Sequence, residues 1–210
     1  SGSTAVTTPR ATVSRWATTS FTPRACPPTP AGGAVLVISA LRYHEGLVRW
    51  LRETAPRASA RRFLYKLHPA QASSLAAIQA ELAGLPNVTV HGTDVTVQTL
   101  LAESSDVLLI QSTVAYEAVQ AGRRLLIIPE LDYATHSDLM TLDGVEVVKD
   151  AAALVEALAH DRPPRTPQVF FEPFDAARAT RILERLMRTG EPFAPAASTA
   201  PSALAATPRA

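Results

Sequence analysis

Cysteine is almost missing from this sequence: Cys26 is the only one in 210 residues. A single cysteine excludes an intrachain disulfide and a zinc site built from cysteines. It fits a reducing compartment, and we expect a cytoplasmic protein, free or at the inner face of the membrane. The net charge of +1 argues against a nucleic-acid partner, because phosphate binding needs clustered lysine and arginine.

Long apolar runs and early acidic residues are missing too. No run approaches the roughly 20 apolar residues that span a bilayer, and no signal-peptide core is present. No Asp or Glu precedes Glu45, and residues 1–33 are rich in Ser, Thr, Pro and Arg. This composition is typical of a disordered linker or of an organelle transit peptide, and the proline-rich part favours the linker. Residues 191–210 form a similar tail. The first residue is Ser1 rather than methionine, so we expect a processed product or a piece of a longer protein.

Residues 34–190 alternate between short apolar runs and amphipathic segments. The predicted strands are 34–40, 63–67, 87–91, 106–110, 124–128 and 145–149. The predicted helices are 44–55, 72–83, 95–103, 113–121, 150–160 and 175–190. This alternation predicts one α/β domain with a Rossmann-like open parallel sheet and helices on both faces. We expect Gly122 and Gly190 to end the helices that precede them.

Several familiar motifs are absent. The chain has no P-loop, no G-x-G-x-x-G after a strand and no G-x-S-x-G elbow, which argues against ATP binding by a P-loop, the usual NAD site and a serine hydrolase. Gly32 precedes the first strand, on the wrong side for a phosphate cradle. Asp132, His136 and Asp138 are close enough in sequence to suggest a metal site, but a polar loop near the substrate is the favoured interpretation. We expect no metal and no cofactor.

The residues that follow the predicted strands are the candidates for binding, because ligands of such sheets sit beyond the carboxyl ends of the strands. His68 ends one strand, and Pro69 keeps it extended. The imidazole is then either a proton or hydrogen-bond donor to an anion, or a cap for the next helix. Lys66 shares its strand face and adds positive charge, or it is an ordinary residue near the sheet edge. Ser39 follows the first strand.

A second candidate group lies where the strand 106–110 turns into a helix. Ser112 and Thr113 stand at the helix start, where a hydroxyl and the first free N–H groups suit an anion, although a plain N-cap explains them as well. Glu117 lies about one turn further along and can reach a ribose diol, or it is a solvated helix residue. The sequence therefore predicts a phosphate site with a carboxylate beside it.

The chain resembles a known family over residues 34–190. The segments that carry the resemblance are YKLHP, LPNVTVHG, SSDVLLIQSTVAYEAVQAGRRLLIIP, GVEVVKDAAALVEAL and FFEPFDAARATRILERL, in that order. They are similar to the C-terminal nucleotide-binding half of GT-B glycosyltransferases. The nearest subgroup has an HP motif and a paired Ser/Thr motif and comprises bacterial sialyl- and polysialyltransferases and related capsule enzymes. Wall-teichoic-acid glycerophosphotransferases are similar.

This resemblance implies an inverting, sialyltransferase-like enzyme of surface-polysaccharide synthesis with a nucleotide-sugar donor, CMP-linked by preference, and a glycan acceptor. It places His68 on the nucleotide phosphate as an aid to its departure. Ser112 and Thr113 would bind phosphate, and Glu117 would hold the ribose. The family often has glycine shortly before the hydroxyl pair, whereas this chain has Gln111.

The catalytic base of sialyltransferases lies in an N-terminal acceptor domain, which the resemblance does not cover here. We therefore expect that half from an upstream segment or a separate partner chain, with peripheral membrane association of the full enzyme. Two alternatives stay open at this point. One is a sugar-nucleotide epimerase of the same fold that uses UDP-sugars, and the other is a non-catalytic nucleotide- or polysaccharide-binding module.

Overall fold

A computed structural model describes residues 30, 32–129, 136–160, 170 and 175–189. Nearly all of the two predicted tails, 1–33 and 191–210, lies outside these residues, as do Asp132 and Gly190. Within the described part of the chain, no helix is long and apolar enough to cross a membrane.

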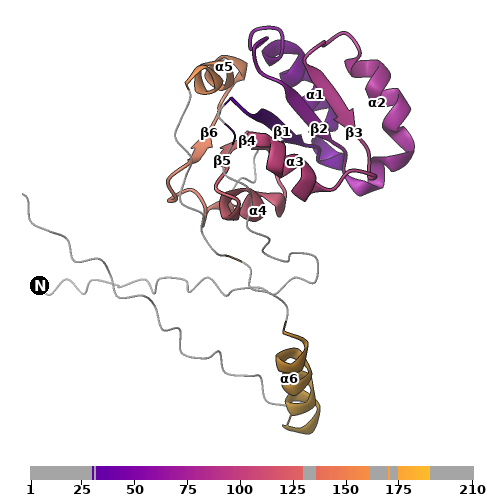
Figure 1. The fold of residues 1–210 in the computed structure, drawn as a ribbon, viewed down its shortest axis with the longest axis vertical. Coiled ribbons are helices and arrows are strands. Elements are labelled where there is room, and N and C mark those ends of the chain that lie inside the picture. Colours follow the sequence, from indigo (N-terminus) through magenta and orange to yellow (C-terminus); the bar gives the residue numbers. More distant parts are fainter. Residues whose placement is uncertain (1–29, 31, 130–135, 161–169, 171–174, 190–210) are drawn as a thin grey trace, which may run out of the picture.

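The described strands form one six-stranded sheet in the order β3-β2-β1-β4-β5-β6 (Figure 1). The strands are β1 Ala34–Ile38, β2 Phe63–Lys66, β3 Val88–His91, β4 Ser104–Leu109, β5 Arg124–Ile127 and β6 Val145–Val147. Every neighbouring pair is parallel. The predicted Rossmann-like parallel sheet is therefore confirmed. Each predicted strand is present, with ends that differ by one to two residues, since local sequence defines element ends least well.

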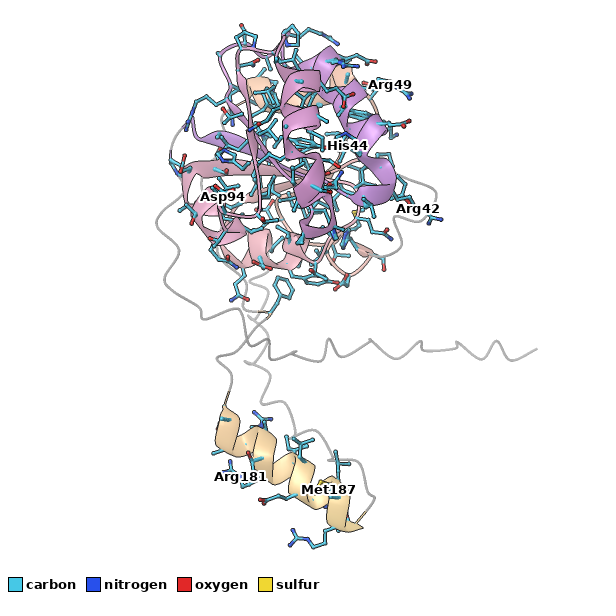
Figure 2. The ribbon with its side chains drawn as sticks, turned by 90° about the vertical axis from the view of Figure 1, so that its right-hand side faces the viewer. Arg42, His44, Arg49, Asp94, Arg181 and Met187 are labelled. Carbon is cyan, nitrogen blue, oxygen red and sulfur yellow. The ribbon has the colours of Figure 1, made fainter. Side chains whose placement is uncertain are left out.

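Helices cover both faces of this sheet. Helices α1 His44–Thr54, α2 Leu75–Leu82 and α5 Ala151–Ala159 pack on one face, and α3 Val97–Glu103 and α4 Val114–Gln120 pack on the other. The other described helices are α6 Ala176–Thr189 and the short 3-10 helices η1 Leu41–Tyr43 and η2 Pro69–Ser74. The predicted helix 72–83 begins as the 3-10 helix η2, which Pro69 starts from its first position. Helix α6 has no buried residue and lies apart from the sheet in Figures 1 and 2.

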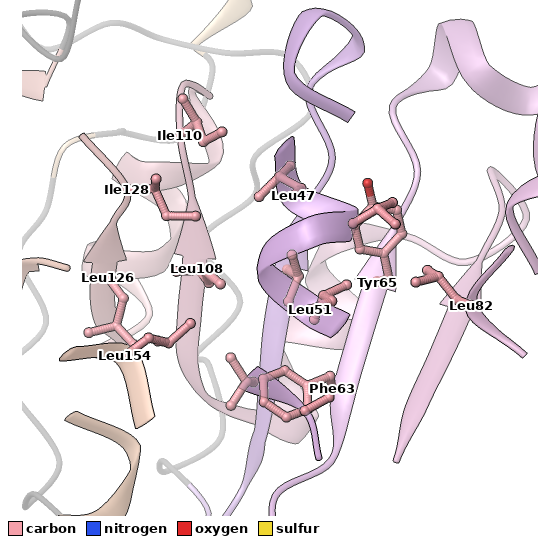
Figure 3. Close-up of a cluster of buried hydrophobic side chains, with 14 of the residues drawn as sticks. Leu47, Leu51, Phe63, Tyr65, Leu82, Leu108, Ile110, Leu126, Ile128 and Leu154 are labelled. Carbon is pink, nitrogen blue, oxygen red and sulfur yellow. The ribbon is translucent and has the colours of Figure 1, made fainter. Parts of the chain in front are cut away.

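The core consists of two apolar layers, one on each face of the sheet, because successive strand side chains point to opposite faces. Val35 and Val37 of β1 pack with Phe63 and Tyr65 of β2 under α1, α2 and α5 (Figure 3). The alternate residues of the same strands, such as Leu36, pack under α3 and α4. Because both faces are buried, β1 is a continuous apolar run, and so are residues 107–109 of β4 and 125–127 of β5.

A charged cluster closes the amino end of the sheet. The Asp106 side chain of β4 is 4% exposed, and its two carboxylate oxygens accept hydrogen bonds from Arg61 and Arg124. Arg61 also donates to the backbone oxygen of Gly33 at 3.0 Å and to Ser105 Oγ at 2.8 Å. A Cβ on Gly33 would come within 2.8 Å of the backbone nitrogen of Ser105, so the strands approach too closely here for a side chain. The cluster ties β1, β4 and β5 together at the edge opposite to the predicted site.

Gly122 has φ 69° and its N–H donates to the Val119 oxygen at 3.0 Å. This is the left-handed conformation that favours glycine after a helix, so the predicted C-cap of α4 is confirmed.

Candidate functional site

The sheet has one topological switch point, between β1 and β4. The chain leaves β1 through α1 on one face of the sheet, whereas it leaves β4 through α4 on the other face. A crevice opens where two such connections diverge, and ligands of open α/β sheets bind there. The ends of β2 and β4 flank the end of β1, and two strand spacings separate them by about 10 Å. His68 follows β2 and Ser112 follows β4, so both predicted groups lie at the carboxyl edge of the sheet, on either side of this switch point.

His68 is exposed and extended, with φ −65° and ψ 142°, as Pro69 was expected to require. Its Nδ1 accepts a hydrogen bond from the Ala70 N–H at 3.2 Å. The imidazole is thus a cap of η2, which is one of the two roles considered from the sequence. Because Nδ1 is the acceptor, the proton of the neutral ring is on Nε2. Nε2 has no hydrogen-bond partner among the described residues, so the ring can cap the helix and still donate to a ligand.

Ser39 is 2% exposed and contacts η2, the 3-10 helix that follows His68. Its Oγ accepts from the Tyr65 hydroxyl at 3.1 Å and donates to Oε1 of Gln71 at 2.7 Å. The same Gln71 oxygen accepts from the His68 backbone N–H at 3.2 Å. Ser39 therefore belongs to the site region through buried hydrogen bonds, and its contact with a phosphate stays a prediction.

Lys66 is 7% exposed, and its Nζ donates to the Gly92 backbone oxygen at 2.5 Å. Burial lowers the pKa of this amine, which the negative charge of Asp94 partly opposes. Asp94 is labelled in Figure 2. In this arrangement the ammonium lies against the β3 side of the edge, and we expect it to act on a ligand mainly through its charge.

Ser112 and Thr113 follow β4 as predicted, but only the Ser112 side chain caps the helix. Ser112 Oγ accepts from the Val114 N–H at 3.2 Å, whereas Thr113 is exposed and makes no capping bond. The Ser112 backbone N–H donates to Nε2 of His136 at 3.3 Å. His136 is 1% exposed, and this burial lowers its pKa, with the charge of Asp138 opposing. A neutral imidazole whose Nε2 accepts therefore fixes the turn between β4 and α4.

Glu117 lies half-buried on the first turn of α4, and its Oε2 accepts from Gln98 Nε2 of α3 at 3.1 Å. Burial raises the pKa of the Glu117 carboxyl, and the hydrogen bond from Gln98 partly offsets the rise. A carboxylate that is held by one donor and partly stripped of water retains acceptor positions for a diol.

The ionised Glu117 carboxylate lowers the stability of the fold, and the size of this effect depends on pH. Because the folded-state pKa is raised, Glu117 destabilises the fold above its ordinary value of 4.5, and the penalty disappears as the pH falls through the folded-state pKa. We expect Glu117→Gln to be more stable than wild type at pH 7 by at most about 1 kcal/mol, since water still screens the half-exposed group. Thermal unfolding at about pH 7 and at about pH 4 tests this, because the second pH lies below the ordinary pKa of a glutamate.

The exposed Glu53→Gln in α1 is the matched control, and it should change neither midpoint. A Glu117→Gln variant that is less stable than wild type at neutral pH would show that the hydrogen bond to Gln98 outweighs the desolvation of the carboxylate.

Of the three residues Asp132, His136 and Asp138, the structure describes the last two, and they lie beside α4. The Tyr116 hydroxyl of α4 donates to the Asp138 carboxylate at 3.0 and 3.1 Å, and burial raises the Tyr116 pKa to about 12. Asp132 lies outside the described residues. Among those that are described, no three His, Cys, Asp or Glu side chains are grouped to hold a metal ion. His136 and Asp138 instead contact α4 and the Ser112 turn, and the loop's nearness to a substrate stays a prediction.

Sequence reasoning missed the buried residues whose hydrogen bonds hold the His68 backbone. Gln71 and Tyr65 were assigned only to a loop and a strand, and the role of His44 was not recognised. A signal was present for Gln71, since a capping residue followed three positions later by Glu or Gln is the pattern of a reciprocal cap. Histidine in the capping position concealed it.

Neither protein-family models nor curated proteins match this sequence. Solved structures do. The wall teichoic acid polymerase TagF matches at 16% identity over 63% of this chain and 33% of its own, with a TM-score of 0.45. UDP-GlcNAc 2-epimerase from Neisseria meningitidis, bound to UDP-GlcNAc, matches at 17% identity over 75% and 45%, with a TM-score of 0.49. The enzyme from Methanocaldococcus jannaschii, in complex with UDP-GlcNAc and UDP, matches at 13% identity over 72% and 45%, with a TM-score of 0.50.

The last of these matches, together with the sheet order, supports the fold alone. The described residues have the Rossmann-like open parallel-sheet fold that was expected, and they share it with the matched part of the Methanocaldococcus jannaschii enzyme. The chain spans less than half the length of each of these solved proteins.

Proposed function

We propose that this chain is the donor-binding domain of a glycosyltransferase of surface-polysaccharide synthesis. It binds a nucleotide-activated sugar, CMP-linked by preference, at the switch point between β1 and β4. The phosphate lies between His68 and the Ser112–Thr113 turn, and Glu117 holds the ribose. The glycan acceptor is bound by a second domain, upstream or on a partner chain.

One observation carries this proposal: two groups suited to phosphate flank the same switch point of the sheet from opposite sides. On the β2 side, His68 offers an Nε2–H that has no partner among the described residues. On the β4 side, Ser112 and Thr113 offer hydroxyls, and the Thr113 hydroxyl is exposed without a capping role. The span of about 10 Å between the two strand ends suits a phosphate and its sugar.

The chemistry follows from the charge that develops during transfer. When an acceptor hydroxyl attacks the sugar, a base of the acceptor-binding domain takes the hydroxyl proton. The bond between the sugar carbon and the phosphate oxygen breaks, and its electron pair stays on the phosphate. A hydrogen bond from His68 Nε2 stabilises that charge more in the transition state than in the bound donor, so it speeds departure. The buried Lys66 adds positive potential at the same edge. The proposal therefore needs no metal.

A second candidate is a sugar-nucleotide epimerase. The likeness to the Methanocaldococcus jannaschii enzyme, whose structure holds UDP-GlcNAc and UDP, favours this candidate as much as a transferase, because the two share the fold. The base of the preferred nucleotide separates them.

Calorimetric titration of the full chain with CMP, CDP, UMP and UDP tests both. We expect CMP or CDP to bind with a dissociation constant below about 1 mM, which corresponds to roughly 4 kcal/mol. A clear preference for the uridine nucleotides would favour the epimerase. Absence of heat with all four nucleotides, from protein with intact far-ultraviolet circular dichroism, would refute the proposed function.

A further inference from the structure

A buried chain of hydrogen bonds runs from the surface of α2 to the backbone of His68. It begins at Glu81, whose Oε2 is 3.4 Å from Nε2 of His44. His44, labelled in Figure 2, has its Nδ1 2.9 Å from the Tyr65 hydroxyl. Tyr65 donates to Ser39, which donates to Gln71 Oε1. That oxygen also accepts the His68 N–H. The residues of this hydrogen-bonded network come from α2, α1, β2, the position directly after β1, and η2.

The bonds from His44 to Gln71 run in one direction. Since the Tyr65 hydroxyl donates to Ser39, it accepts from His44, which places a proton on His44 Nδ1. The contact of His44 Nε2 with the Glu81 carboxylate is an ion pair when Nε2 carries a proton as well. Ser39 has used its only proton on Gln71. At the far end, Gln71 holds His68 from two sides, because its oxygen accepts the His68 N–H and its own N–H donates to the His68 carbonyl at 2.8 Å.

This polar chain is expensive to bury. Tyr65 is fully buried, beside Leu51 and Leu82 in Figure 3, and burial raises its pKa to about 12. Gln71 is 5% exposed. Apolar side chains of similar shape would fill the same volume without the cost of desolvation. A fully bonded buried network instead fixes one arrangement of the groups that it joins. The group at its end is His68.

We propose that Gln71, supported by Ser39 and Tyr65, is the positioning residue that sets the His68 imidazole for the ligand. This inference rests on the proposed function for the identity of the ligand. Gln71 holds the His68 backbone, so that Nδ1 stays on the Ala70 N–H and the proton stays on Nε2 at the crevice. The packing of α1 and α2 against the sheet is thereby connected to the geometry of a loop that is otherwise exposed.

The test compares Gln71→Met, which keeps the length of the side chain and removes its acceptor, with Gln71→Glu, which keeps an acceptor oxygen. Gln79→Met on the exposed face of α2 is the matched control. Long-range proton–nitrogen spectra of the full chain, at about pH 8 where an ordinary imidazole is neutral, report which His68 nitrogen carries the proton. Titration with CDP then measures affinity.

In wild type and Gln79→Met we expect His68 signals of a single tautomer with the proton on Nε2. In Gln71→Met we expect averaged ring signals and CDP binding weakened about tenfold, the effect of losing one buried acceptor. Gln71→Glu should restore most of both. Unchanged His68 ring signals in a folded Gln71→Met protein would overturn the positioning role. If wild type binds no nucleotide, the proposed function fails, while the ring signals still decide whether Gln71 sets the tautomer.

Discussion

Asp106→Asn should lower the free energy of unfolding by about 3–5 kcal/mol, which is the usual cost of removing one partner from a buried ion pair. The carboxylate lies between Arg61 and Arg124, whose side chains are only 11% and 5% exposed. Asparagine keeps the shape of the aspartate but removes the charge. Both guanidinium groups would then stay largely buried without a counter-charge.

The two arginines also donate hydrogen bonds to backbone oxygens of α5. Arg61 donates to the Leu158 oxygen at 3.3 Å, and Arg124 donates to the Ala157 oxygen at 2.8 Å. These bonds attach the end of α5 to the sheet. We therefore expect the loss of Asp106 to loosen α5 as well, with faster amide exchange along that helix.

Urea unfolding, followed by circular dichroism, measures the effect. Glu53→Gln in α1 is the matched control, since Glu53 is exposed and the loss of its charge should change stability by less than about 0.5 kcal/mol. A loss below about 1 kcal/mol for Asp106→Asn would mean that the cluster behaves as a solvated surface pair rather than a buried one.

The fold could be predicted because its signal is local. Residues 34–38 and 125–128 are buried on both faces of the sheet, and each forms a continuous apolar run that predicts a strand. The charged cluster could not be predicted in the same way. Arg61, Asp106 and Arg124 belong to separate stretches of sequence, and each looks like a polar residue at the edge of an element. Only the strand order places them side by side.

In the candidate site, too, local conformation could be predicted from the sequence, whereas contacts between distant residues could not. Pro69 restricts its neighbour through covalent geometry, so the extended conformation of His68 followed from the sequence. The partners of Ser39 and Glu117 did not follow from the sequence, because Tyr65 and Gln98 reach them across neighbouring elements. Sequence spacing identifies which residues stand at the sheet edge. It does not show which of their atoms are already engaged by the protein.

For His68, one ring nitrogen, Nδ1, already accepts a hydrogen bond from the protein, so the cap and the ligand contact can be tested separately. His68→Ala removes both the capping nitrogen and the nitrogen proposed to meet the phosphate. His68→Asn restores a capping acceptor, since asparagine is among the best N-caps, but leaves no donor in the place of Nε2. We expect His68→Ala to lose about 1 kcal/mol of stability and His68→Asn to lose little. Both should bind CDP roughly ten- to a hundredfold more weakly than wild type, the range for one lost hydrogen bond to a charged group.

The comparison of the two variants separates the two roles of the imidazole. Thermal unfolding reports the cap, and calorimetric titration with CDP reports the ligand contact. His160→Ala, at the exposed end of α5, is a control for loss of a histidine far along the chain from the site and should leave affinity unchanged. If His68→Asn binds CDP as wild type does, the imidazole is a helix cap alone, and the phosphate must find its positive charge elsewhere, with Lys66 the nearest buried source on the same strand. If affinity falls while stability holds, the Nε2–H is the group that meets the nucleotide.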